Sequence, residues 1–281
     1  VGDSSVILCW LDNPNFTLIE ADLLDVSSVE DALKGCDEVY HLAANPEVNT
    51  KNASPEDHFH QNIETTFNLL EAMRRSGEQR FIVFTSSSTV YGEAKMIPTK
   101  EDYGPLGPIS MDGASKLACE ALLASYASMN GFRAIIYRLA NVVGPRSNHG
   151  VIYDFVNKLT ENPDKLEVLG DGSQSKSYSY IDDCIHGIIQ GIIRGNQIDI
   201  FNLGTPSKTN VLEIAEIVKD EMGLTTAEIN LTGGVDGGRG WKGDVKTMQL
   251  ALNELRSTGW TPAYTSSEAV KLTARSIIDN L

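Results

Sequence analysis

The chain of 281 residues is long enough for roughly two domains, since a domain commonly takes about 150 residues. It has 38 acidic against 23 basic residues, a formal net charge of −15, and 41% hydrophobic residues. This composition is typical of a globular protein, and the acidic balance argues against nonspecific binding to nucleic acid or to an anionic membrane surface. Strands and helices are then expected in alternation along the first half of the chain.

In that half, Ser27 and Glu30 form a capping-box pattern, Ser54 precedes Pro55 at a second helix start, and Gly77 ends that helix. Apolar residues repeat at helical spacing between these signals, and short apolar runs flank them. The predicted strands cover residues 16–21, 37–44, 80–85 and 133–139, and the predicted helices cover residues 27–35, 54–77 and 111–130.

The alternation of strands and helices predicts an α/β fold with a doubly wound parallel sheet, because helices must then cover both sheet faces. The second half is less regular. Its predicted strands cover residues 166–169 and 198–203, its predicted helices cover residues 183–194, 211–222 and 266–281, and its richest turn segments are residues 141–150 and 233–243.

Neither a leader, a membrane span nor a metal site is expected. Residues 1–13 lack a basic stretch followed by an apolar core, and no apolar run approaches the roughly 18–20 residues that span a bilayer. The four cysteines are far apart, and the five histidines are scattered, so zinc spacing is missing. We therefore expect a cytoplasmic protein with four reduced thiols, at Cys9, Cys36, Cys119 and Cys184.

Three segments are candidates for ligand binding, because ligands of such sheets lie beyond the carboxyl ends of the strands. They are residues 41–44 (HLAA), 85–92 (TSSSTVYG) and 141–146 (NVVGPR). The hydroxyls from Ser86 to Thr89 either bind a polar substrate or cap the next turn. A further glycine pattern, residues 234–240, follows a strand-like segment, but Arg239, Trp241 and Lys242 crowd it, so we do not assign it to a dinucleotide.

The order HLAA, NIETTFNLLEA, SSSTVYG, GASK, NVVGP and GWKGD resembles the extended short-chain dehydrogenase/reductases, within the NAD-dependent epimerase/dehydratase family. It is most similar to archaeal-type UDP-glucose 4-epimerases, from about residue 22 to residue 281. The resemblance implies a Rossmann-like NAD-binding domain and a smaller C-terminal α/β domain for a UDP-sugar. The first would hold residues 1–145 and about 180–210, and the second residues 146–179 and 211–281.

In such epimerases a tyrosine takes the proton of the sugar 4-hydroxyl while NAD takes the hydride from C4, and the hydride returns to the other face. The resemblance places Ser87, Asp112 and Lys116 at the catalytic positions. It places Asp22, Leu23, Leu42, Ala43, Ala44, Asn62, Ser86, Lys116 and Ala140 at the cofactor, and Ser87, Thr89, Asn141, Gly150, Val151, Lys176, Arg239 and Asp244 at the substrate.

Asp112 departs from the family, because a tyrosine is expected four residues before Lys116. An aspartate has a reference pKa near 3.9 against about 10 for tyrosine, so it is a weak base towards an alcohol, and it is shorter by a ring. Alternatively, Asp112 forms an ordinary helical ion pair with Lys116. We therefore expect slow epimerisation or none.

Three other comparisons with the family motifs bear on function. The family's first strand, glycine loop, helix and second strand, roughly 35 residues, are not found in the sequence given, so weak NAD binding is expected. Lys176 stands where the family often has arginine. A lysine binds a phosphate as a point charge, whereas an arginine guanidinium donates two parallel hydrogen bonds to it. Ser88 and Thr89 replace the Asp-Glu pair of the family's dehydratases, which favours an epimerase.

Two other functions remain open. One alternative is that the chain is a catalytically inactive relative that binds nucleotide sugar, or a fragment without function. The other, weaker alternative is a dehydratase, decarboxylase or reductase that acts on a nucleotide sugar. The resemblance also implies a homodimer, through a four-helix bundle formed by the helices at about residues 55–75 and 111–130.

Overall fold

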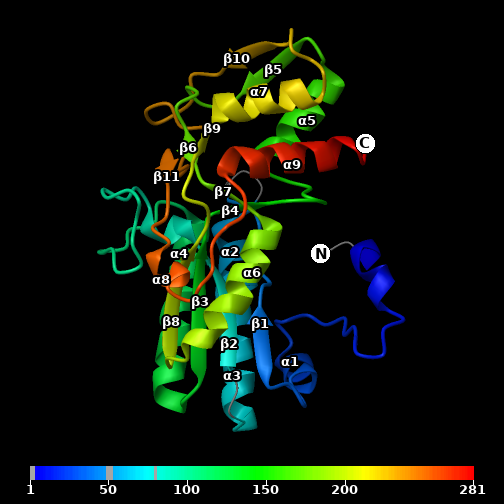
Figure 1. Cartoon of the computed structure of the whole chain (residues 1–281). Coiled ribbons are helices and arrows are strands. Elements are labelled where there is room, and N and C mark those ends of the chain that lie inside the picture. Colours follow the sequence, from blue (N-terminus) through cyan, green and yellow to red (C-terminus); the bar gives the residue numbers. More distant parts are fainter. Residues whose placement is uncertain (1–3, 49–52, 79–80) are drawn as a thin grey trace.

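The computed structural model describes residues 4–48, 53–78 and 81–281, and its main sheet has four parallel strands in the order β1-β2-β3-β8 (Figure 1). The inner strands β2 and β3 are mostly buried, as their continuous apolar runs predict. Their bounds are Glu38–His41 for β1, Phe81–Ser87 for β2, Arg133–Leu139 for β3 and Ile198–Leu203 for β8.

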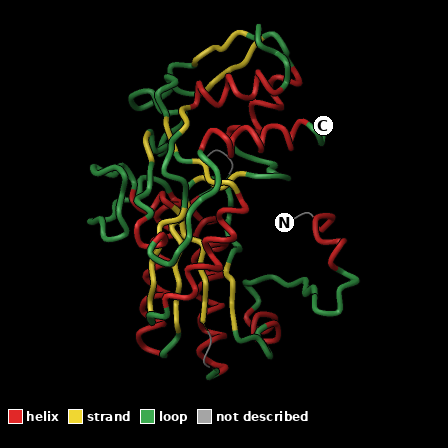
Figure 2. Tube along the Cα trace, viewed as in Figure 1, coloured by secondary structure: helices red, strands yellow, loops and turns green. Residues whose placement is uncertain are grey.

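Helices cover both faces of this sheet, as Figure 2 shows. On β2, Ile82 and Phe84 pack against one set of helices, while the intervening Val83 packs with Cys184 on the opposite face. This alternation confirms the predicted doubly wound, Rossmann-like fold. The first face carries α1 (Val26–Ala32), α3 (Thr65–Ser76) and α4 (Met111–Asn130), and the second carries α6 (Ile181–Gly191).

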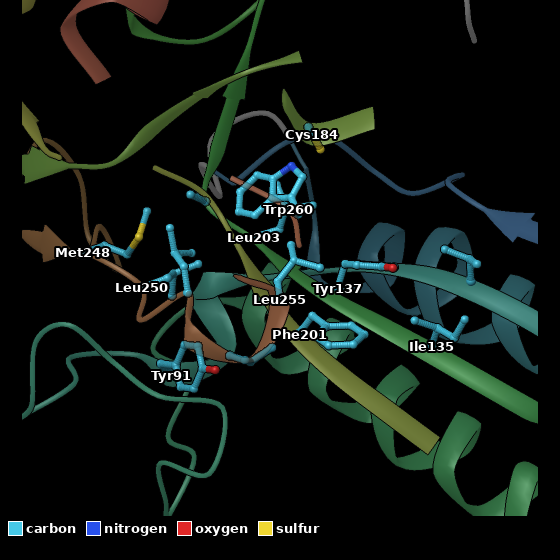
Figure 3. Close-up of a cluster of buried hydrophobic side chains, with 14 of the residues drawn as sticks. Tyr91, Ile135, Tyr137, Cys184, Phe201, Leu203, Met248, Leu250, Leu255 and Trp260 are labelled. Carbon is cyan, nitrogen blue, oxygen red and sulfur yellow. The ribbon is translucent and has the colours of Figure 1, made fainter. Parts of the chain in front are cut away.

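The core on the α6 face joins segments that are far apart in the sequence (Figure 3). Tyr137 of β3 stacks on Phe201 of β8 with ring centroids 5.6 Å apart. Trp260 packs in the same cluster and donates from its indole nitrogen to the Asp183 carbonyl at 3.1 Å. The chain after β8 therefore returns to complete this core, which includes Leu255 of α8 (Asn253–Arg256).

A separate hydrophobic cluster holds the rest of the second half. Phe155, Leu166 and Val218 are fully or almost fully buried in it. The division of the chain into two domains stays a prediction. The helices of this part are α5 (Val151–Glu161), α7 (Val211–Glu221) and α9 (Ser266–Ile278). Its strands form two pairs, β5 (Lys165–Val168) with β10 (Glu228–Leu231) and β4 (Asn141–Val143) with β7 (Tyr178–Tyr180). A small third sheet holds β11 (Thr247–Met248), β6 (Ser175–Lys176) and β9 (Thr209–Asn210).

Two predicted elements at the start of the chain are wrong. Residues 16–21 form no strand, because no described strand lies beside them to pair with their backbone groups. Residues 17–21 are exposed. They belong to the loop that joins η1 (Ser4–Trp10) to α1 (Figure 1). The capping box at Ser27 does not form either. Instead, the Asp25 carboxylate caps α1 by accepting from the Ser27 backbone N–H, and the hydroxyls of Ser27 and Ser28 also donate to it.

The second helix start is confirmed in detail. Ser54 and Asp57 form a capping box, and Pro55 occupies the first turn of α2 (Pro55–His58). The helix continues through a π-helical turn, η2 (Phe59–Glu64), into α3, which ends at Gly77 in the left-handed conformation. Of the strand predicted at 80–85, residue 80 lies outside the described residues.

The glycine pattern at 234–240 forms a tight turn in which the backbone of Val235 pairs with that of Arg239. No helix begins in residues 232–252, all of which the structure describes, so the turn lacks the helix that a dinucleotide loop requires. None of the four cysteines, all of which lie in described segments, forms a disulfide. Among the helices of the described residues, none combines the length and hydropathy needed to cross a bilayer.

Candidate active site

The carboxyl ends of β1, β2 and β3 open into a cavity of about 490 Å³. The parallel sheet brings these ends to one edge, so segments far apart in sequence meet there. Most of the predicted site residues line this cavity: Leu42, Ala44, Ser86, Ser87, Thr89, Asp112, Lys116, Ala140, Asn141, Gly150, Val151, Lys176 and Asp244.

Lys116 reaches the cavity from α4. Its Nζ donates to the Thr85 carbonyl at 2.7 Å and lies 4.8 Å from the centroid of the Phe84 ring. Burial lowers the pKa of Lys116, because the surrounding protein solvates the ammonium less well than water does. The strand end therefore fixes this ammonium in place before any ligand enters.

Asp112 lies in the first turn of α4, where it is 7% exposed. Its Oδ2 accepts from Thr89 Oγ1 at 2.7 Å, and the same Thr89 oxygen lies 2.7 Å from Ser87 Oγ. The helix approaches this hydroxyl pair closely, since a Cβ on Gly113 would lie 2.6 Å from the Thr89 carbonyl oxygen. The predicted ion pair does not form: within the described part of the chain, no ion pair joins Asp112 to Lys116.

A buried ion pair lies behind the cavity wall and bonds to it through Ser86. Arg138 contacts the Glu120 carboxylate with both Nε and Nη2, and the two side chains are 4% and 6% exposed. Ser86, which lines the cavity, donates to Glu120 at 2.5 Å. Tyr91 receives a hydrogen bond from Arg138 at 2.9 Å, and burial raises the pKa of Tyr91 to about 12. This pattern favours a structural role for Tyr91 over that of a base.

Asn62 does not line the cavity but bonds to a residue that does. Its Oδ1 accepts from the Asn45 backbone N–H at 2.7 Å, and its Nδ2 donates to Ser115 at 2.8 Å. Asn45 lines the cavity, so Asn62 sets the course of the chain after β1.

Three other predicted cofactor residues lie outside the cavity. Asp22 is exposed and accepts from the Leu24 backbone N–H, and Leu23 packs against the α1 and α3 core. Ala43 does not line the cavity, although its neighbours Leu42 and Ala44 do.

A second cavity of about 470 Å³ shares walls with the first, among them Gly150, Val151, Lys176 and Asp244. Lys176 Nζ lies 2.6 Å from Asp244 Oδ1 and 5.5 Å from the Trp241 ring centroid. Arg239 does not line either cavity, because its guanidinium bonds to Glu93 and to the Asp244 carbonyl.

Sequence reasoning missed four prominent cavity residues: Asn45, His149, Tyr178 and Trp241. Each lies within two residues of a predicted one, so proximity to the motifs was the available signal. It also missed Glu120, whose spacing after Asp112 and Lys116 places all three on one face of α4.

The fold and this cavity define a Rossmann-like α/β protein whose lysine and hydroxyls meet at the carboxyl edge of the sheet. The chain belongs to the NAD dependent epimerase/dehydratase family, whose model matches residues 4–204. It is 30% identical to a putative UDP-glucose 4-epimerase of Methanocaldococcus jannaschii over 264 residues, covering 92% of this chain and 83% of that protein.

Two solved structures are similar along most of the chain. A UDP-galactose 4-epimerase is 43% identical, with a TM-score of 0.84 over 96% of this chain and 86% of that one. The UDP-glucuronic acid 4-epimerase of Bacillus cereus, in complex with UDP-glucuronic acid and NAD, is 26% identical, with a TM-score of 0.87 over 99% of this chain and 86% of that one. These likenesses confirm the family that the sequence motifs indicate.

Proposed function

We propose that the chain is a nucleotide-sugar 4-epimerase of the UDP-glucose/UDP-galactose type, and that Asp112 makes it slow. The observation that carries this proposal is the convergence of Ser87, Thr89 and Lys116 on one cavity. That cavity continues into a second one that holds a lysine and a helix start. The 43% identity to a UDP-galactose 4-epimerase supports the choice of substrate.

NAD, when bound, supplies the acceptor and donor of the hydride at C4 of the sugar. The Lys116 ammonium and the Ser86 hydroxyl suit a nicotinamide ribose, and Leu42, Ala44 and Ala140 give an apolar wall beside them. Asn62 acts through Asn45, and we assign Asp22, Leu23 and Ala43 to the adenosine side on resemblance alone. The residues that line the cavity would therefore hold the nicotinamide half of the cofactor.

The substrate would lie across both cavities. Ser87 and Thr89 offer hydroxyls to the 4-oxygen of the sugar, and Asn141 lies beside them at the start of β4. The backbone at Gly150 and Val151 starts α5, and free N–H groups at a helix start favour an anion such as a diphosphate. Lys176 adds a point charge, and Arg239 could join only if it left Glu93.

The test is turnover by the purified chain with NAD and UDP-galactose, followed as UDP-glucose formation, beside a calorimetric titration with UDP alone. Slow conversion together with UDP binding is the expected result. Binding without conversion would identify an inactive nucleotide-sugar-binding relative, and absence of both would overturn the proposal. Conversion of UDP-glucuronic acid in preference to UDP-galactose would change the substrate but keep the reaction.

We further propose a homodimer through α3 and α4. Phe67 of α3 is 43% exposed, Phe59 of η2 is 50% exposed and Met129 of α4 is 81% exposed. Phe67 also packs edge-on against Tyr126 of α4, so the apolar surface spans both helices.

A further inference from the structure

A chain of hydrogen bonds leads from the cavity to Asp112. Thr89 Oγ1 lies 2.7 Å from both Ser87 Oγ and Asp112 Oδ2. A hydroxyl has one proton and two lone pairs, whereas a carboxylate only accepts. Thr89 can donate to just one of these neighbours, and Asp112 has no proton to give. The arrangement that satisfies all three groups has Thr89 donating to Asp112 and accepting from Ser87.

The backbone holds both ends of this series of hydrogen bonds in place. Ser87 is the last residue of β2 and the N-cap of η3 (Ser88–Tyr91), and its hydroxyl accepts from the Thr89 backbone N–H at 3.2 Å. Asp112 is held on the other side, because Gly113 allows α4 to approach the Thr89 carbonyl. All three side chains line the same cavity.

We propose that Ser87 and Thr89 relay the proton of the substrate alcohol to Asp112, which is the terminal base of this epimerase. The inference rests on the proposed function. An aspartate ends closer to the helix backbone than a tyrosine would, and the two hydroxyls bridge that difference. Lys116 is not the acceptor, because an ammonium has no lone pair and this one already donates to Thr85.

Each step of the transfer balances. Ser87 Oγ takes the alcohol proton as its own proton moves to Thr89, and the Thr89 proton moves to the Asp112 carboxylate. The C–H bond at C4 breaks, its hydride passes to the nicotinamide that the proposed function requires, and the alcohol becomes a ketone. Return of the hydride to the other face reverses the relay and restores the carboxylate.

The decisive variants are Thr89→Val, which removes the hydroxyl at nearly constant shape, and Thr89→Ser, which keeps it. With UDP-galactose and NAD, Thr89→Val should lower kcat by about 100-fold while KM changes little, and Thr89→Ser should recover most of kcat. Asp112→Asn should match Thr89→Val, and the double variant should be no slower than either, since both break one relay. Thr89→Val with unchanged kcat in an active enzyme overturns the relay and leaves the proposed function standing. No NADH formation and no conversion by the unchanged chain overturns both.

A second measurement needs no cofactor. The carboxylate infrared band of Asp112, obtained by subtracting the spectrum of Asp112→Asn, should shift in Thr89→Val and stay in place in Thr89→Ser, because only the hydroxyl bonds to it. Equal spectra in both threonine variants contradict the relay even if their activities differ. Urea unfolding of each variant shows whether a lost rate reflects a lost fold.

Discussion

Asp112 and Lys116 lie one helical turn apart on α4, yet their charged groups bond to different partners. The Asp112 carboxylate accepts from Thr89, and the Lys116 ammonium donates to the Thr85 carbonyl. The spacing of four residues favours an ion pair in an isolated helix. Here the Thr89 hydroxyl bonds to Asp112 and the carbonyl at the end of β2 bonds to Lys116, and these contacts take the place of the ion pair. Both charged side chains line the cavity. Asp112, where the sequence departs from the family motif, is therefore bonded to a hydroxyl of the cavity and not to Lys116.

Replacing Asp112 by tyrosine should raise the epimerase rate by about 100-fold or more, because a phenol reaches the sugar alcohol directly and has a pKa suited to proton exchange with it. The measurement is UDP-galactose conversion at saturating NAD. Asp112→Phe is the matched control, since it adds the ring without the hydroxyl, and it should stay at or below the original rate. Equal rates for Asp112→Tyr and the unchanged chain would show that Asp112 does not limit turnover.

His41 should make the fold sensitive to acid. It is 3% exposed, its Nε2 lies 2.9 Å from Thr66 Oγ1, and burial followed by the nearby Lys116 charge lowers its pKa to about 4. In the unfolded chain the pKa of His41 is about 6.5. Between that pH and about 4, the unfolded state therefore binds a proton at His41 and the folded state does not. Stability therefore falls as the pH drops from 6.5 towards 4.

Urea unfolding at pH 7 and pH 4 tests this. Relative to His41→Asn, the unchanged chain should lose about 3 kcal/mol of unfolding free energy over that interval, which follows from the two pKa values. The same substitution at the exposed His186 should leave the pH dependence unaltered. Parallel curves for His41→Asn and the unchanged chain would mean that His41 takes up its proton in the folded state.

Local signals predicted the parts of the fold that local interactions determine. The strand at 133–139 and the helix at 111–130 have the predicted bounds, because a buried apolar run and a regular helical stretch carry their own periodicity. Residues 16–21 have a strand pattern too, but a strand also needs a neighbour, which the pattern does not supply. For the site, the motifs located the cavity residues. They did not predict that Arg239 bonds to Glu93, because that partner is 146 residues away in sequence.

Lys176 should carry a measurable share of nucleotide affinity. It lines both cavities but already pairs with Asp244 at 2.6 Å, so a phosphate must compete with that carboxylate. Lys176→Ala should weaken UDP binding by about tenfold, the usual scale of one charge-assisted hydrogen bond, and Lys176→Arg should bind at least as tightly as lysine because its fork can serve both anions. Calorimetry gives the dissociation constants. Lys208→Ala, at an exposed lysine outside both cavities, is the control, and an equal loss there would indicate a general charge effect.

The homodimer should depend on Phe67. Substitution by serine removes an exposed aromatic ring from the surface shared by α3 and α4, and a self-associating face loses most when a central aromatic residue is truncated. Sedimentation velocity should show a dimer for the unchanged chain and a monomer for Phe67→Ser at micromolar concentration. Ile193→Ser removes a more exposed apolar residue, at 70%, outside that surface, and should leave the dimer intact. A monomeric unchanged chain would contradict the proposal directly.

The Glu120–Arg138 pair should be the most costly polar contact to break near the site. Both side chains are at most 6% exposed, so Glu120→Gln leaves a buried guanidinium without its counter-charge, and Ser86 loses a charged acceptor. Breaking one side of such a pair typically costs about 3 to 5 kcal/mol, and we expect a loss near the lower value because the glutamine oxygen still accepts one hydrogen bond. The control is Asp31→Asn, which breaks the pair between Lys34 and Asp31, side chains that are 76% and 73% exposed. It should change the free energy by less than about 0.5 kcal/mol, since water screens that pair. Urea unfolding at pH 7 measures both variants, and similar small losses for the two would mean that solvent reaches the buried guanidinium.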